Sequence, residues 1–147
     1  MKKLILALAA AVSLVHAADG KLEWMTDAPK AIAKAKEDKK IVVLHFTGSD
    51  WCGFCIKQDK EVFSTDEFGK YAKENLVLVD LDFPNKKKLP DDLKKANEAL
   101  KEKYGVKGFP TLVFLDAEGK EIGRKVGYGG GGPTAVIGEI KKAAGKS

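Results

Sequence analysis

Two apolar runs constrain the fold of this chain more than any other feature. Ile41–Phe46 and Leu76–Asp82 are rich in Val, Ile and Leu, and their lack of regular alternation is typical of strands buried on both faces. Helical patterns separate and follow these runs. Strands that alternate with helices predict an α/β fold, with a mainly parallel sheet covered by helices on both faces.

The remaining patterns complete the order β-α-β-α-β-α-β-β-α. Apolar and β-branched residues indicate three further strands, at 22–25, 111–115 and 121–126. Caps and helical spacing indicate five helices. They run from Asp27 to about Lys39, from the cysteine pair to about Phe63, from Ser64 to about Glu74, from Asp91 to about Tyr104, and onward from Pro133.

The first 17 residues have the layout of a secretory signal peptide. Met1-Lys2-Lys3 is positively charged, Leu4–Val15 is apolar apart from Ser13, and Val15-His16-Ala17 offers small residues for cleavage before Ala18. The apolar run is shorter than the ~20 residues that span a bilayer. We therefore expect a signal peptide at 1–17, one domain at 18–147, export to the periplasm or another extracytoplasmic compartment, and membrane contact only through the cleaved peptide.

The charge pattern argues against a nucleic-acid partner. The formal net charge is +5, but the lysines are interleaved with Asp and Glu, and Arg124 is the only arginine. Lys86-Lys87-Lys88 is the densest basic run, and it indicates either a solvated loop or a docking point for an acidic partner.

The two cysteines carry the clearest chemical signal. Cys52 and Cys55 stand at i and i+3 in the first turn of a predicted helix, close enough for a disulfide. Amides at a helix N-terminus favour a thiolate, so we expect the pKa of Cys52 to fall below its ordinary value of about 8.5 and Cys52 to be the nucleophile. Cys55, one turn inside the helix, is expected to be the shielded resolving thiol.

Other uses of the pair are less well supported. A structural disulfide around so short a loop restrains little of the unfolded chain. A zinc site needs about two more ligands, and His45 is the only histidine left after signal-peptide removal. Haem attachment needs a histidine where this chain has Ile56. We therefore expect no metal and no organic cofactor, and the alternative to an enzyme is a redox-silent binding or chaperone-like module.

These segments resemble a known family. Trp51-Cys52-Gly53-Phe54-Cys55 is similar to the Trp-Cys-Gly-Pro-Cys site of thioredoxins, and Gly108-Phe109-Pro110-Thr111 resembles the segment that carries their cis-proline. Phe46–Cys52 and Lys60–Ser64 resemble exported bacterial thioredoxin-family proteins, some of them described as disulfide isomerase-like or DsbH-like. The resemblance implies a thioredoxin fold for residues 18–147, with a central mixed sheet and helices on both faces.

The resemblance also implies substrate-binding residues. Pro110, if cis, lies against the sulfurs and places the Phe109 backbone to pair with an extended substrate segment. Trp51 covers one side of the site. Phe54 stands where thioredoxins have proline, which leaves the direction of electron flow open. Tyr128, in a loop that lines the same groove, either touches substrate or packs.

His45 marks a departure from the family. It falls where thioredoxins carry a buried aspartate that accepts the proton of the resolving cysteine. An imidazole with an ordinary pKa of ~6.5 moves protons at neutral pH, and the other interpretation is a neutral, packed histidine with no catalytic task.

These implications together predict an exported thiol–disulfide oxidoreductase. They favour a reductase or isomerase of protein disulfides over an oxidase. Its partners would be cysteine-containing client proteins and a membrane or soluble redox partner that resets the cysteine pair.

Overall fold

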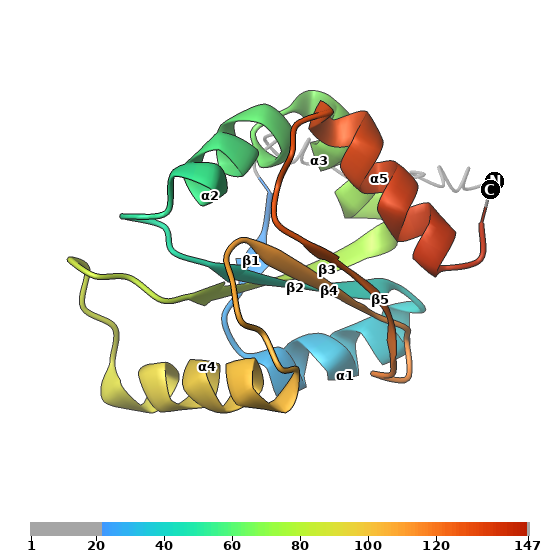
Figure 1. Ribbon diagram of the computed structural model, residues 1–147. Coiled ribbons are helices and arrows are strands. Elements are labelled where there is room, and N and C mark those ends of the chain that lie inside the picture. Colours follow the sequence, from blue (N-terminus) through green and yellow to red (C-terminus); the bar gives the residue numbers. More distant parts are fainter. Residues whose placement is uncertain (1–21, 147) are drawn as a thin grey trace, which may run out of the picture.

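The computed structural model describes residues 22–146, so the predicted signal peptide lies outside the described residues. Five strands form one sheet in the order β1-β3-β2-β4-β5 (Figure 1). The first three of these are parallel, whereas β4 runs antiparallel to β2 and β5 antiparallel to β4. The strands are β1 (Trp24–Met25), β2 (Ile41–Thr47), β3 (Leu76–Asp82), β4 (Thr111–Leu115) and β5 (Glu121–Val126).

Helices cover both faces of the sheet, which confirms the predicted α/β class and element order. In Figure 1, α1 and α4 lie below the sheet and α2, α3 and α5 lie above it. The helices are α1 (Ala28–Asp38), α2 (Gly53–Gln58), α3 (Asp66–Asn75), α4 (Asp91–Lys103) and α5 (Gly132–Ala143). The helix predicted from the cysteine pair to Phe63 is right in extent, but its second half is a π-helical segment, η1 (Asp59–Phe63). No helix within residues 22–146 combines the length and apolar character needed to cross a bilayer.

Side-chain caps start two helices, one at the predicted Asp27 and one at Thr65, one residue after the Ser64 at which the predicted capping box begins. Asp27 accepts a hydrogen bond from the Lys30 amide at 3.0 Å, and Thr65 accepts one from the Phe68 amide at 3.3 Å. Each cap satisfies an amide that has no partner inside its helix.

The sheet separates two hydrophobic cores. On the upper face, alternate strand residues such as Val43 and Leu78 pack against η1, α3 and α5. On the lower face, their neighbours, such as Val42 and Leu44, pack against the small side chains of α1 and against α4. Because successive strand residues point to opposite faces, a continuous apolar run serves both cores.

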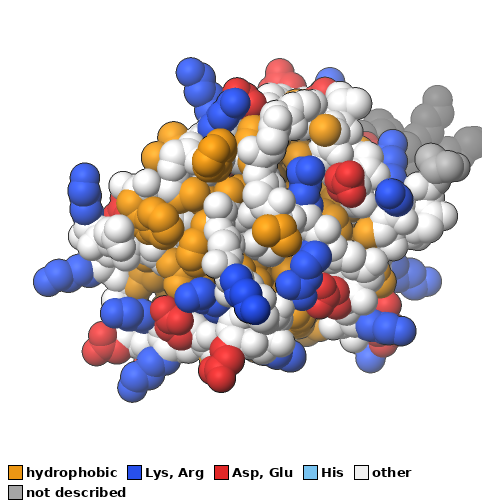
Figure 2. Space-filling view, viewed as in Figure 1, with side chains coloured by type: hydrophobic (Ala, Val, Ile, Leu, Met, Phe, Trp, Pro, Cys, Tyr) orange, Lys and Arg blue, Asp and Glu red, His pale blue; other side chains and the backbone are white. Residues whose placement is uncertain are grey.

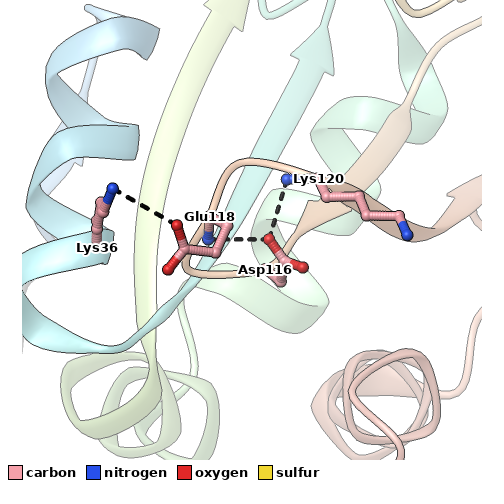
Figure 3. Close-up of polar contacts among 4 residues, drawn as sticks. All are labelled: Lys36, Asp116, Glu118 and Lys120. Atoms are coloured by element: carbon pink, nitrogen blue, oxygen red, sulfur yellow. Dashed lines mark hydrogen bonds and ion pairs between the residues drawn. The ribbon is translucent and has the colours of Figure 1, made fainter.

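The β4–β5 hairpin is closed by Asp116. Its Oδ1 accepts hydrogen bonds from the amides of Glu118 and Lys120 at 2.9 and 3.0 Å (Figure 3). Glu118 also forms an exposed ion pair with Lys36 of α1, 3.5 Å between Nζ and Oε2. The turn is therefore stabilised by hydrogen bonds within it, and its contact with α1 is an exposed ion pair.

Candidate active site

Cys52 and Cys55 are joined by a disulfide, with 5.2 Å between their Cα atoms. Cys52 is the N-cap of α2, and its Sγ accepts a hydrogen bond from the Cys55 amide at 3.2 Å. Cys52 is 6% exposed and Cys55 is fully buried. Cys52 thus keeps a small exposed fraction and an amide donor to its sulfur, whereas Cys55 is shielded.

Two carboxylates fasten the turn that leads into α2. Asp82, at the end of β3, accepts hydrogen bonds from the amide and hydroxyl of Ser49. Asp50 accepts three more, from the amides of Asn85, Lys86 and Lys87, at 2.8 to 2.9 Å. These hydrogen bonds hold the pKa of Asp50 below its usual range, and the one from the Asn85 amide has the largest effect. The lysine run therefore belongs to a loop that is tied to the active-site turn.

Trp51, the residue before Cys52, packs against Phe109. The Trp51 Nε1 donates a hydrogen bond to the carbonyl of Phe83 at 2.7 Å, and its ring meets that of Phe109 edge to face at 5.7 Å. The peptide bond between Phe109 and Pro110 is cis. The Pro110 carbonyl accepts a hydrogen bond from the Gly127 amide at 2.7 Å. Within residues 22–146 the backbone N–H and C=O of Phe109 have no backbone partner.

A groove of about 530 Å³ adjoins this aromatic group. Lys101 lies over the rings of Phe83 and Phe109, at 5.6 and 5.8 Å from their centroids. The charges that line the groove are of both signs: Lys87, Lys88, Lys94, Lys101, Asp82, Asp91 and Glu98.

Among residues 22–146 four large apolar side chains are exposed, and we call them the apolar rim: Trp51 at 45%, Phe54 at 63%, Ile56 at 50% and Val126 at 68%. The first three flank the cysteines in sequence, and Val126 pairs with Thr111 beside Pro110. Figure 2 shows hydrophobic side chains gathered over the region of α2 and the adjoining loops, with lysines around them. Ile56 and Val126 were not expected in this role, because a single exposed apolar residue has no pattern in the sequence.

His45 lies under the site, packed against the rings of Trp24 and Phe63 with centroids at 5.5 and 4.9 Å. Burial lowers its pKa from 6.5 to about 3. The nearby Gln58 side chain has a smaller, opposite effect and raises the pKa of His45. The geometry between the Gln58 amide and His45 Nε2 does not meet the criteria for a hydrogen bond. These contacts favour the neutral, packed histidine over the proton relay.

Tyr128 is buried in the upper core and is 4% exposed. Its hydroxyl donates to Glu61 Oε2 at 2.7 Å and accepts from the Gly132 amide at 3.3 Å. Burial, followed by the bond to Glu61, raises its pKa. The contacts favour the packing alternative over contact with substrate.

Two partly buried carboxyl groups were missed in the sequence. Burial raises the pKa of Asp59 and of Asp80 to about 6 each, and the charge of Asp82 adds to both effects. Asp80 is directly opposite His45 in the β2–β3 register. The sequence predicts both strands but not the register between them, and the pairing of Asp80 with His45 follows only from that register. Within residues 22–146 no cluster of three or more His, Cys, Asp or Glu side chains is placed to hold a metal ion.

Comparison with known proteins gives consistent matches. A thioredoxin-like domain matches residues 28–132. The disulfide bond reductase DsbH of Chlamydia pneumoniae is 42% identical over 122 residues, 83% of this chain and 72% of DsbH. The thiol:disulfide interchange protein DsbD of Cronobacter sakazakii is 32% identical over 120 residues, 80% of this chain and 19% of DsbD. A solved structure of a DsbH oxidoreductase superposes with a TM-score of 0.77 at 37% identity, over 96% of this chain and 90% of that one.

Proposed function

The chain belongs to the thioredoxin-like family and is a thiol–disulfide oxidoreductase of the Dsb type, and we propose that it is exported and works as a reductase or isomerase of protein disulfides. The predicted thioredoxin fold is confirmed by the match to DsbH. The reducing direction is supported by the 42% identity to a protein named a disulfide bond reductase. Export is supported by the layout of residues 1–17.

The observation that carries the proposal is the position of Cys52 at the N-cap of α2. Its Sγ faces the Cys55 amide, so the helix N-terminus stabilises negative charge on this sulfur once the disulfide is reduced. A thiolate is both the attacking and the leaving species in disulfide exchange. The pair is thus built for reversible chemistry and restrains a loop too short to matter for stability.

The reaction proceeds in two exchanges when it runs as a reduction. The Cys52 thiolate attacks one sulfur of a client disulfide, that S–S bond breaks, and the other client sulfur leaves as a thiolate and is protonated. Cys55 loses its proton and attacks Cys52 Sγ, which breaks the bond to the client and releases the second client thiol. The client gains two electrons and two protons, and the enzyme closes the Cys52–Cys55 disulfide.

The client binds, in this proposal, as an extended segment beside Pro110. The backbone N–H and C=O of Phe109 are free to pair with such a segment, as in β-augmentation. Trp51 and Phe54 supply exposed apolar surface on either side of Cys52. Backbone pairing provides the affinity and the apolar side chains provide the preference, which suits an enzyme with many clients.

A redox partner must return the pair to its dithiol form after each reduction. We propose a protein of the thiol:disulfide interchange class, membrane-bound or soluble, because such a protein can pass two electrons to the Cys52–Cys55 disulfide by the same exchange chemistry.

Trapping of the mixed disulfide tests the proposed function. The Cys55→Ser variant keeps the nucleophile and lacks the resolving thiol, so it should accumulate covalent adducts with client proteins through Cys52. The Cys52→Ser variant is the matched control and should form no such adducts. Absence of adducts with Cys55→Ser in the compartment to which the chain is exported would contradict the enzymatic reading.

The reduction potential of the pair decides the direction. A value near about −270 mV would favour a reductase, and one near about −120 mV an oxidase. Equilibration with glutathione buffers, followed by quantification of the dithiol and disulfide forms, measures it. A strongly oxidising value would overturn the reductase or isomerase assignment and leave the oxidoreductase in place.

A further inference from the structure

Polar groups occupy the face of the sheet beneath the disulfide. In the parallel register of β2 and β3, His45 is opposite Asp80 and Thr47 is opposite Asp82. Directly paired residues point to the same face of a sheet. This is the face covered by α2 and η1, since Phe63 of η1 packs against the His45 ring. The polar side chains therefore point toward the helix that carries the cysteines.

The helix brings a carboxyl group to the same space. The Asp59 amide donates to the carbonyl of Cys55, one helical turn earlier, so the two side chains lie on the same side of the helix. The charges of Asp59 and Asp82 both act on Asp80, and that of Asp82 acts on Asp59. The buried resolving cysteine and these carboxyl groups thus face the space between one helix and two strands.

Buried polar atoms line this space as well. Thr47 Oγ1, His45 Nε2 and both amide atoms of Gln58 are buried and have no hydrogen-bond partner within the part of the chain that the structure describes. Unpaired polar groups in a core are destabilising, and a cluster of them in a native fold calls for a functional explanation. Proton transfer is such a function, because it needs polar groups along its path.

The carboxyl groups, and not the imidazole, change charge near neutral pH. Burial keeps His45 neutral, with a pKa of about 3, whereas Asp59 and Asp80 have pKa values of about 6. Lys87, in the loop after β3, lowers the pKa of Asp80. A group that ionises just below neutral pH is suited to take a proton from a thiol and give it up again.

We propose that Asp80, coupled to Asp59, accepts the proton of Cys55 in the resolving step, the task that thioredoxins assign to an aspartate at the position of His45. The inference rests on the proposed function. The Cys55 S–H proton passes to the Asp80 carboxylate, and the Cys55 sulfur bonds to Cys52 Sγ. The bond between Cys52 and the client sulfur breaks, and its electron pair leaves with the client thiolate, which takes a proton from water. Asp80 then returns its proton to water.

The test isolates the resolving step. The dithiol form is mixed with a peptide disulfide, and the decay of the mixed disulfide is followed by acid quench and mass spectrometry from about pH 5 to about pH 8. In the wild type the rate should rise through a step near pH 6, as the coupled carboxyl pair ionises. In Asp80→Asn the step should be lost and the rate at pH 7 should fall at least about tenfold.

Two further variants separate this role from a structural one. Lys87→Gln should move the step to higher pH without removing it, because the lysine lowers the pKa of Asp80. His45→Gln should keep the step. Attack by Cys52 on the peptide, measured in the same mixing experiment, should stay within about twofold of wild type in Asp80→Asn if the site is intact.

Each outcome decides the matter. A step near pH 6 that persists in Asp80→Asn, or one that disappears in His45→Gln, overturns the inference and leaves the proposed function standing. If Asp80→Asn does not fold, an unmoved step in Lys87→Gln overturns it. Failure of Cys55→Ser to form any mixed disulfide would instead overturn the proposed function, and this inference with it.

Discussion

Replacing His45 by glutamine removes a buried base, and the effect on stability should grow as the pH falls. Burial lowers the pKa of His45 from 6.5 to about 3 in the folded chain. Between these values the unfolded chain binds a proton that the folded chain excludes, so the free energy of unfolding of the wild type decreases as the pH falls. Glutamine binds no proton in either state, and His45→Gln escapes this loss.

The size of the effect follows from the pKa difference. At pH 4 the solution lies about 2.5 pH units below the ordinary pKa of His45, and each unit corresponds to about 1.36 kcal/mol. The wild type should therefore lose about 3 kcal/mol of stability relative to His45→Gln between pH 7 and pH 4. Asp59 and Asp80 act in the opposite sense, because their raised pKa values make the folded chain take up protons first. Both proteins contain them, so their contributions cancel in the comparison.

Urea unfolding of the oxidised proteins at pH 7 and pH 4, followed by tryptophan fluorescence, measures this double difference. Thr47→Val, which removes a buried hydroxyl that does not titrate, is the matched control and should show no change with pH. A difference between wild type and His45→Gln that stays constant within about 1 kcal/mol would refute the buried neutral histidine. It would indicate instead that His45 keeps its ordinary pKa in the folded chain.

Three further predictions concern packing, the hairpin and the client surface. Phe68→Ala should destabilise the fold by about 3–5 kcal/mol in urea unfolding, because the ring is fully buried against Phe63, and a loss below about 1 kcal/mol would contradict the core assignment. Asp116→Ala should cost about 1–2 kcal/mol, since two backbone amides lose their acceptor, whereas Glu118→Gln should cost less than about 1 kcal/mol; the reverse order in thermal unfolding would refute this account of the turn. Phe54→Ser should leave stability within about 0.5 kcal/mol and raise the KM for a peptide disulfide, and an unchanged KM would remove Phe54 from the client surface.

The strands and helix starts could be predicted because their signals are local. The first four residues of β2 and of β3 serve a core on each face, and this requirement leaves a continuous apolar run in the sequence. Asp27 and Thr65 cap their helices through contacts three residues away. The cysteine pair was recognisable for the same reason, since its chemistry needs two residues one helical turn apart.

The features that escaped prediction depend on contacts between distant segments. The pKa of His45 results from burial among rings of β1 and η1, and no pattern around the residue reports it. The pairing of His45 with Asp80 requires the register of two strands separated by a helix pair. Tyr128 lies in the loop that the resemblance to thioredoxins places along the groove, but its hydroxyl reaches Glu61, 67 residues away.

The residues of the site are supported by different hydrophobic cores on the two faces of the sheet. The cysteines, His45 and Tyr128 are on elements that pack into the upper core, whereas Phe83 and Phe109, which support Trp51, pack against the lower one. Substitutions on the α4 side therefore act on the support of Trp51 through Phe83 and Phe109, whereas substitutions in η1 act on the packing of His45, so the two sides of the sheet offer separate routes to the same site.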